Sequence, residues 1–263
     1  MPAYPGDTMT MTYEEMERLA EGEDTPPETL LAVAREGDEE IRKTVAWHEH
    51  APDDVFELVK DEPYLIQILE YRASEGIPLS KRLVTILHDS KEPLVKRQVA
   101  YSENAPKEIL ETLSSDPSDH VRIAVAANPR TPVTVLETLS KDKEEIVRRK
   151  VARNPSTPCS VLISLIEDAH YAVRRCVAEN KQLPPDELVR MSKDHEGHVR
   201  YCVAGNPSTP EHCLCSLAED KYYEIRANVA MNPNCPDHLL DKLSEDEIDL
   251  VYNRARERRS ERS

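Results

Sequence analysis

A proline recurs about every 26 residues along most of this 263-residue chain. The spacing changes once, through a two-residue insertion between the third and fourth prolines. The series is Pro26, Pro52, Pro78, Pro106, Pro132, Pro158, Pro184, Pro210 and Pro236. A unit of this length is one supersecondary element that cannot bury its apolar side alone, so neighbouring units must stack into a solenoid with a continuous core. The period therefore predicts a repeat protein of about nine units.

Each unit carries two sets of apolar residues at helical spacing. The first set lies four and seven residues after the proline, as at Leu136 and Leu139. The second lies fifteen and nineteen residues after it, as at Val147 and Val151, and an alanine follows. Residues three or four apart share one face of a helix. We therefore expect two short helices per unit, which become stable only when the adjacent unit covers them.

Polar residues mark the ends of these helices. Threonine precedes the proline in several units, as at Thr157, and we expect its hydroxyl to cap the helix that follows. Thr25 with Glu28 has the spacing of a capping box. An aspartate ten residues after the proline, such as Asp142, is placed to cap the second helix. That helix should end at an asparagine such as Asn154, because the residue before a proline is disfavoured in the α region.

These features combine in the pattern Val-Arg-x-x-Val-Ala-x-Asn-Pro-x-Thr-Pro-x-x-x-Leu-x-x-Leu-x-x-Asp. The pattern is nearly complete over residues 121–142, 147–168 and 199–220, and it resembles the leucine-rich repeat variant family. Convincing copies cover 106–246, weaker copies reach back to Pro26, and the unit between Pro52 and Pro106 is degraded.

The resemblance implies an all-α fold, a right-handed superhelical solenoid in which α-helices alternate with short 3₁₀ helices. A HEAT-like α-solenoid is the near alternative, because the 26-residue period is slightly longer than we expect of the variant repeats. With only 6 Gly, 1 Phe and 1 Trp, and without strand-type alternation, the chain should contain almost no β structure.

The continuous period predicts one array over residues 25–249. An acidic leader and N-terminal cap over 1–24, with 1–12 disordered, should precede it, and a basic tail over 250–263 should follow. Apolar runs are far shorter than a membrane span, and the N-terminus lacks the layout of a signal peptide. We therefore expect a cytoplasmic protein without a membrane segment.

The net charge of −16 is uneven along the chain. Residues 1–60 contain 16 acidic and 5 basic residues, so 11 of the excess negative charges lie there. A soluble end cap explains this best, and a docking site for a basic partner is the alternative. The arginines of the last segment are a weak candidate for nucleic-acid contact, because the acidic body would repel phosphate.

An arginine recurs sixteen residues after the proline in most units. One interpretation is structural, a ladder of ion pairs to the capping aspartates, since the planar guanidinium suits a carboxylate. The other is functional, a face that binds an anionic partner, reinforced by arginines nearby such as Arg153. The candidate binding face comprises Arg122, Arg148, Arg149, Arg174, Arg175, Arg200 and Arg226.

All six cysteines lie in the second half of the chain, and we expect free thiols in a cytosolic protein. A weak candidate zinc site comprises His212, Cys213, Cys215, Cys235 and His238, but its spacing is not that of a CxxC site. Some members of the resembling family carry an iron–sulfur cluster ahead of the repeats. Because the first cysteine here is Cys159, we expect neither that cluster nor any other cofactor.

Histidines near acidic residues, at His48, His50, His195 and His198, are interpreted as surface or capping groups. The sequence has no glycine-rich phosphate loop or nucleophile elbow. We therefore predict a non-catalytic scaffold that presents an extended face to a protein partner, without identifying that partner or the oligomeric state. The alternatives are a nucleic-acid-binding repeat protein and a metal or redox protein that uses the late cysteines.

Overall fold

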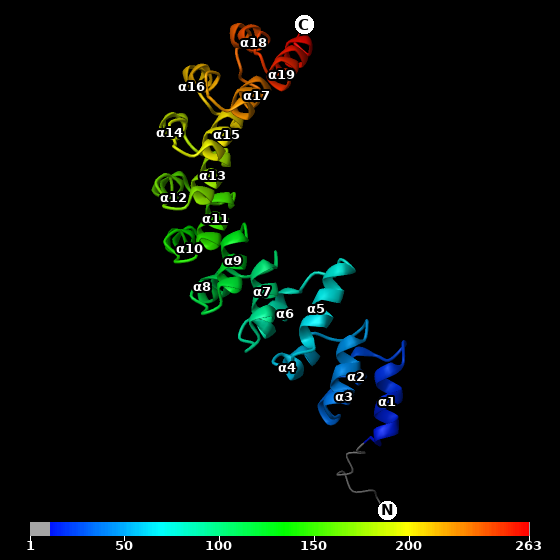
Figure 1. The fold of residues 1–263 in the computed structure, drawn as a ribbon. Coiled ribbons are helices and arrows are strands. Elements are labelled where there is room, and N and C mark those ends of the chain that lie inside the picture. Colours follow the sequence, from blue (N-terminus) through cyan, green and yellow to red (C-terminus); the bar gives the residue numbers. More distant parts are fainter. Residues whose placement is uncertain (1–10, 263) are drawn as a thin grey trace, which may run out of the picture. The chain divides into compact units, whose positions relative to one another are not determined.

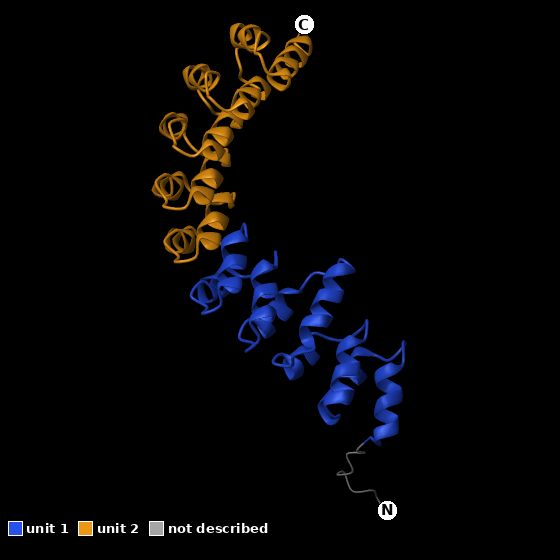
Figure 2. Cartoon of the chain, in the orientation of Figure 1, with its two compact units in different colours: residues 1–130 blue, residues 131–263 orange. Residues whose placement is uncertain are grey.

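The computed structural model describes residues 11–262, and over this range it contains nineteen α-helices and no strand (Figure 1). The predicted all-α helical-repeat fold is confirmed. The chain forms two compact units, residues 1–130 and 131–263 (Figure 2). The period of 26 residues continues from Pro106 to Pro132 and gives no sign of this division.

Unit 1 contains nine of the described helices, most of them in pairs of one helix after the proline and one before the next. They are α1 (Tyr13–Glu21), α2 (Pro27–Glu36), α3 (Glu39–Trp47), α4 (Val55–Val59), α5 (Leu65–Ser74), α6 (Lys81–Leu87), α7 (Pro93–Tyr101), α8 (Lys107–Leu113) and α9 (Asp119–Ala127). The core includes Leu30 and Val33 of α2 and Ile41 and Val45 of α3, which are buried as the spacing predicts.

Unit 2 contains the remaining ten described helices. They are α10 (Val133–Leu139), α11 (Glu145–Arg153), α12 (Cys159–Ser164), α13 (Tyr171–Glu179), α14 (Pro185–Met191), α15 (Gly197–Gly205), α16 (Glu211–Leu217), α17 (Tyr223–Met231), α18 (Asp237–Leu243) and α19 (Asp249–Ser260). The odd-numbered helices pack on one another in a row, and the even-numbered helices form a second row beside them (Figure 1). Val147 and Val151 of α11 and Leu136 and Leu139 of α10 are buried, as predicted.

The helix after each proline is α, so separate 3₁₀ helices are not found in the described range. The amide of Leu136, for example, donates to the carbonyl of Pro132 four residues back, at 3.0 Å. Three-residue hydrogen bonds occur at both ends of this helix, where the amide of Val135 donates to the carbonyl of Pro132 at 3.0 Å and the amide of Asp142 donates to the carbonyl of Leu139 at 3.1 Å. The tighter hydrogen bonding thus marks the turns that enter and leave the helix.

The prediction that threonine caps the following helix is wrong. The N-cap residue is the proline, and the Thr157 hydroxyl instead donates to the carbonyl of Val151 near the end of the preceding helix, at 2.6 Å. Thr25 and Glu28 form no capping box either, because α2 has no side-chain cap. The threonine therefore satisfies a carbonyl at a helix C-terminus, which also lacks an intrahelical partner.

The aspartates also bind the turn before the second helix, and not the first turn of that helix as predicted. Asp142 accepts the amide of Glu144, which is itself the N-cap residue of α11, at 2.9 Å. The carboxylate therefore shapes the turn before the helix and does not cap the helix itself. Asp168, Asp194, Asp220 and Asp246 each accept the amide two residues ahead in the same way.

Both ends of the chain contain helix. Residues 1–10 of the predicted disordered leader lie outside the described range, and α1 occupies most of the rest of the predicted cap. The predicted basic tail coincides with α19, whose Val251 and Ala255 are buried. The boundaries at residues 24 and 249 stay predictions. No helix among the described residues is long and apolar enough to cross a membrane.

Candidate functional site

The arginine row of unit 2 lies on the odd-numbered helices and binds aspartates in the turns of the next repeat, so it joins consecutive repeats. Nε and Nη2 of Arg174 lie 2.7 and 3.0 Å from the two carboxylate oxygens of Asp194, twenty residues ahead. Nη1 of the same arginine donates to the carbonyl of Asp168 in its own repeat, at 2.8 Å. The same geometry recurs at the pairs Arg148–Asp168, Arg200–Asp220 and Arg226–Asp246. The predicted ladder of ion pairs is therefore present in unit 2.

The ladder is largely shielded from solvent. The side chains of Arg174 and Asp194 are only 7% and 9% exposed. Burial alone would raise the pKa of Asp194, but the hydrogen bonds from Arg174 and from the amide of Glu196 stabilise the carboxylate more, so its pKa lies below its ordinary value. The hydrogen bonds that Arg174 donates to Asp194 correspondingly raise the pKa of Arg174. These groups are held as fixed charges within the frame of the repeat.

Three further arginines belong to the predicted binding face. Arg122 in unit 1 is buried and donates to the carbonyls of Asp116 and Pro117. Arg149 is half-buried on α11. Arg175 on α13 lies 3.4 Å from Glu179, and that carboxylate also pairs with Arg153 at 2.9 Å. The structure therefore does not assemble the seven arginines into one exposed cationic surface.

A second ladder, of asparagines, runs alongside the arginines, and the sequence analysis missed it. The Asn206 side chain donates to the carbonyl of Ala178 in the preceding repeat at 2.8 Å, and its oxygen accepts the amide of Ser208. Asn180 and Asn232 form equivalent bonds. The recurrent Asn-Pro pair was interpreted only as a helix stop. The signal for a second role was that asparagine, and no other helix-ending residue, recurs there.

The late cysteines and histidines do not converge on one point. Cys213 and Cys235 are buried, Cys215 is half-buried and His212 is exposed. Sγ of Cys215 and Nε2 of His238 lie 3.9 Å apart. Within residues 11–262, no group of three or more histidines, cysteines or carboxylates could hold a metal ion. Burial raises the pKa of Cys235 to about 11, so this thiol stays protonated at neutral pH.

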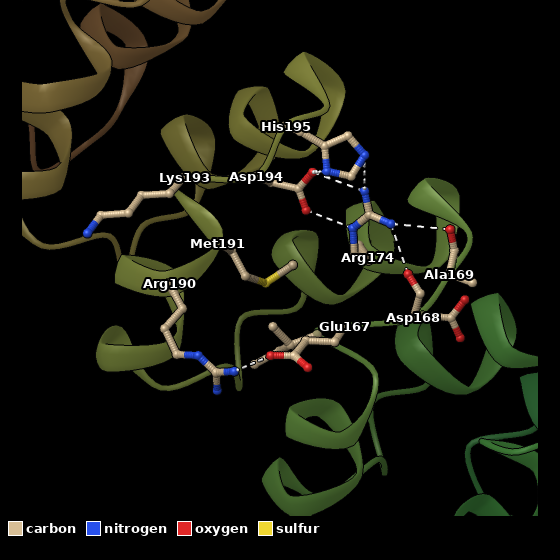
Figure 3. A pocket seen from close by; sticks show the side chains of 10 residues that line it. Glu167, Asp168, Ala169, Arg174, Arg190, Met191, Lys193, Asp194 and His195 are labelled. Atoms are coloured by element: carbon tan, nitrogen blue, oxygen red, sulfur yellow. Dashed lines mark hydrogen bonds and ion pairs between the residues drawn. The ribbon is translucent and has the colours of Figure 1, made fainter.

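A polar hollow of about 450 Å³ surrounds the Arg174–Asp194 pair (Figure 3). Its arginines are already paired. Arg174 is held by Asp194, and Arg190 binds Glu167 at 2.8 Å and Glu187 at 2.7 Å. His195, in the corner between helices as predicted, lies at its edge with its ring mostly exposed. The hollow is thus part of the frame, and its charges are largely matched.

A second hollow, the aromatic groove, lies between α15 and α17 and has a volume of about 540 Å³. Tyr201 and Tyr222 in its walls are 39% and 45% exposed. The groove is lined by Glu196, Gly197, His198, Tyr201, Tyr222, Glu224 and Ile225. Exposed aromatic side chains gathered in one hollow are typical of a surface that binds another molecule.

Two glycines in α15 determine the shape of this groove. A Cβ at Gly197 would come within 3.1 Å of the Tyr222 ring, so the absent side chain leaves room for the ring. A Cβ at Gly205 would come within 2.6 Å of the amide nitrogen of Asn228, whose Nδ2 donates to the carbonyl of Tyr201 at 2.8 Å. Helices α15 and α17 are therefore tied together beside the groove, and its walls are fixed in place.

The aromatic surface continues onto α13. The ring centroids of Tyr171 and His198 lie 5.8 Å apart, and Tyr171 also stacks on His170 at 5.4 Å. The sequence analysis treated His198 as a surface group and did not single out the tyrosines. The available signal was a glycine at the start of a helix, followed by Tyr201 and Tyr222 at positions where other repeats carry different residues.

Comparison with known proteins identifies the fold. The chain matches no protein-family model and no curated protein. It is similar to the solved structure of a leucine-rich repeat variant with a novel repetitive structural motif, at 23% identity and a TM-score of 0.56, covering 97% of this chain and 91% of that one. The chain therefore has the fold of a leucine-rich repeat variant, as the repeat pattern predicted.

Two further similarities are more distant. An engineered protein is 16% identical over 94% of this chain and 84% of its own, with a TM-score of 0.40. A designed armadillo repeat protein is 12% identical over 88% of this chain and 98% of its own, with a TM-score of 0.24. Scores this low support no argument about this chain.

Proposed function

We propose that this protein is a non-catalytic scaffold that binds another protein through unit 2, with the aromatic groove at the centre of the contact. The observation that carries the proposal is the gathering of His198, Tyr201 and Tyr222 around one hollow, with Tyr171 adjoining. Tyrosine offers a large contact area with few rotatable bonds, and it is enriched at protein interfaces.

The different roles of the ladder residues and the groove residues in unit 2 support this proposal. The arginine and asparagine ladders use their polar groups to join repeats, so they offer little to a ligand. Tyr201 and Tyr222 occupy positions that vary between repeats, where a solenoid can change its surface without disturbing its frame. These observations support a binding face at the groove rather than along the arginine row.

The chemistry of unit 2 also favours binding over catalysis. Burial raises the pKa of Cys202 to about 12, which makes this thiol a poor nucleophile at neutral pH. The carboxylates with lowered pKa values in the turns, such as Asp194 and Asp220, are held by arginines and by backbone amides. They therefore act as permanent anions of the frame and are poorly suited to proton transfer.

The test is capture of partners from native extract with three forms of the full chain. They are the wild type, the groove variant Tyr201→Ala/Tyr222→Ala, and the matched control Trp47→Ala/Tyr71→Ala, which removes an exposed aromatic pair from unit 1. We expect the groove variant alone to lose the partner. Equal capture by all three forms would contradict the proposal. Binding to duplex nucleic acid that weakens with salt would favour the nucleic-acid alternative.

A further inference from the structure

We infer that the aromatic groove recognises an arginine side chain carried by the partner. This inference rests on the proposed function and specifies its chemistry. The groove combines aromatic rings with two carboxylates, from Glu196 and Glu224. A guanidinium group suits such a site because it stacks on an aromatic ring and forms paired hydrogen bonds to a carboxylate.

The charges around the groove favour a cation. Glu224 forms no ion pair with any described residue, so its carboxylate is available. Glu196 lies 3.8 Å from the exposed His195, and the nearby Arg174 is already bound to Asp194. Arg200 is bound through two hydrogen bonds to Asp220 and adds little net charge. Residues 131–263 contain 23 acidic and 20 basic residues, so unit 2 is nearly neutral and the attraction for a cation comes from the carboxylates of the groove itself.

The rings of Tyr201 and Tyr222 differ in how accessible they are to a cation from the partner. Tyr222 already has two cations near its ring, Lys221 at 5.0 Å and Arg200 at 5.8 Å from the centroid. Tyr201 has no such neighbour within the described part of the chain, and it is 39% exposed. We therefore assign stacking of the partner's guanidinium to Tyr201, pairing to Glu224, and the wall of the groove to Tyr222.

The groove is large enough and rigid enough for this role. Its volume of about 540 Å³ is within the range of ligand pockets and exceeds that of one guanidinium group. The bond from Asn228 to the carbonyl of Tyr201 fixes the two helices beside it. A site that is formed before binding loses less conformational entropy when the ligand arrives.

The test uses three fluorescently labelled peptides of Gly and Ser around one central residue, which is arginine, lysine or citrulline. Citrulline keeps the shape of arginine and lacks its charge. Their binding to the full chain is measured by fluorescence anisotropy at low salt. We expect the arginine peptide to bind most tightly, the lysine peptide about threefold more weakly and the citrulline peptide about tenfold more weakly.

Variants locate the site. Glu224→Gln and Tyr201→Ala should each weaken binding of the arginine peptide at least about fivefold. Glu211→Gln, which neutralises an exposed glutamate on α16 outside the groove, should leave it unchanged. Because Tyr201 and Glu224 are exposed, their variants should melt like the wild type, and circular dichroism checks this.

Two outcomes would overturn the inference. Equal binding of the arginine and citrulline peptides, or no binding of either, would show that the groove does not select a cation. Equal weakening by Glu211→Gln would show attraction to the acidic chain as a whole. If the groove variant still loses the captured partner in either case, the proposed function stands and only the arginine preference fails.

Discussion

The two units join their repeats by different means. In unit 2 the same bond recurs at each step, from Arg148 to Arg226, with Nε to carboxylate distances of 2.6 to 2.7 Å. In unit 1, Lys96 binds Asp116 at 2.9 Å, and in the degraded stretch Lys60 binds Asp89 at 3.0 Å. Stacked turns therefore need a polar bridge, but many residue pairs can supply one. Repeating one pair keeps the repeats uniform.

The asparagine position shows the same contrast. In unit 2 asparagine recurs at Asn180, Asn206 and Asn232, and each side chain donates to the preceding repeat. In unit 1 that position is held by Asn128 in one repeat and by His48 in another, where Nε2 lies 3.0 Å from the carbonyl of Gly22. A ring nitrogen thus replaces the amide nitrogen at this position.

The largest expected effect is the destabilisation caused by removing a core side chain, and it tests whether that destabilisation stays within one unit. Leu162 in α12 is fully buried, so Leu162→Ala should lower the free energy of unfolding by roughly 2–5 kcal/mol. Because solenoid repeats contact only their neighbours, hydrogen exchange should accelerate mainly in α11 to α14. The fluorescence of the single tryptophan, Trp47, should not change in native conditions. Faster exchange in α2 and α3 of equal size would contradict this local coupling.

Lowering the pH should destabilise the two units to different extents, because their ion pairs differ. Four aspartates of unit 2 have pKa values below the ordinary value of 3.8, namely Asp168, Asp194, Asp220 and Asp246. Burial raises each pKa, but the hydrogen bonds from the arginine partner and from a backbone amide lower it more. These carboxyls bind protons less readily when folded than when unfolded. The stability that they contribute is present above that value and is lost as the pH falls through the lowered pKa values.

In unit 1, the hydrogen bond from Lys60 lowers the pKa of Asp89, and these two residues form a single exposed pair and not a ladder. Below about pH 4, hydrogen exchange should therefore accelerate more in unit 2 than in unit 1. The check is exchange resolved by peptide across an acid series, with Trp47 fluorescence reporting on unit 1. If unit 1 opens first as the pH falls, the ladder is not the acid-sensitive element.

The smallest effect concerns the threonines before the prolines. Thr157 is buried and its hydroxyl donates to the carbonyl of Val151, so Thr157→Val should cost about 1 kcal/mol. Thr25 in unit 1 is also buried, but its hydroxyl forms no hydrogen bond with a described residue. We expect Thr25→Val to cost less than about 0.5 kcal/mol. Urea unfolding of both variants checks the difference, and equal costs would contradict it.

The sequence predicted the repeating frame but not the partner of every side chain within it. The period, the two helices, the Leu and Val core and the link from Arg174 to a turn aspartate all follow from residues that recur in register. The partner of the Thr157 hydroxyl could not be predicted, because a hydroxyl before a proline can bind either the preceding or the following helix. The partners of Asn206 were missed because a pattern in one chain does not show which repeat a side chain reaches.

The aromatic groove could not be predicted from the repeat pattern for a related reason. Tyr201 and Tyr222 lie 21 residues apart in sequence, and neither belongs to a recurring column. Their proximity depends on how α15 and α17 pack, which the absent side chain at Gly197 permits. The division after Arg130 is also invisible in a period that continues across it.

The central claim is that buried arginine–aspartate pairs hold unit 2 in register, and a double-mutant cycle tests it most directly. The cycle compares Arg174→Ala and Asp194→Ala, alone and together, with Lys96→Ala and Asp116→Ala in unit 1. We predict a coupling energy of about 1–3 kcal/mol for the arginine pair. The lysine should contribute less than about 1 kcal/mol, because it is 22% exposed and makes a single contact. Near-zero coupling between Arg174 and Asp194 would contradict the claim.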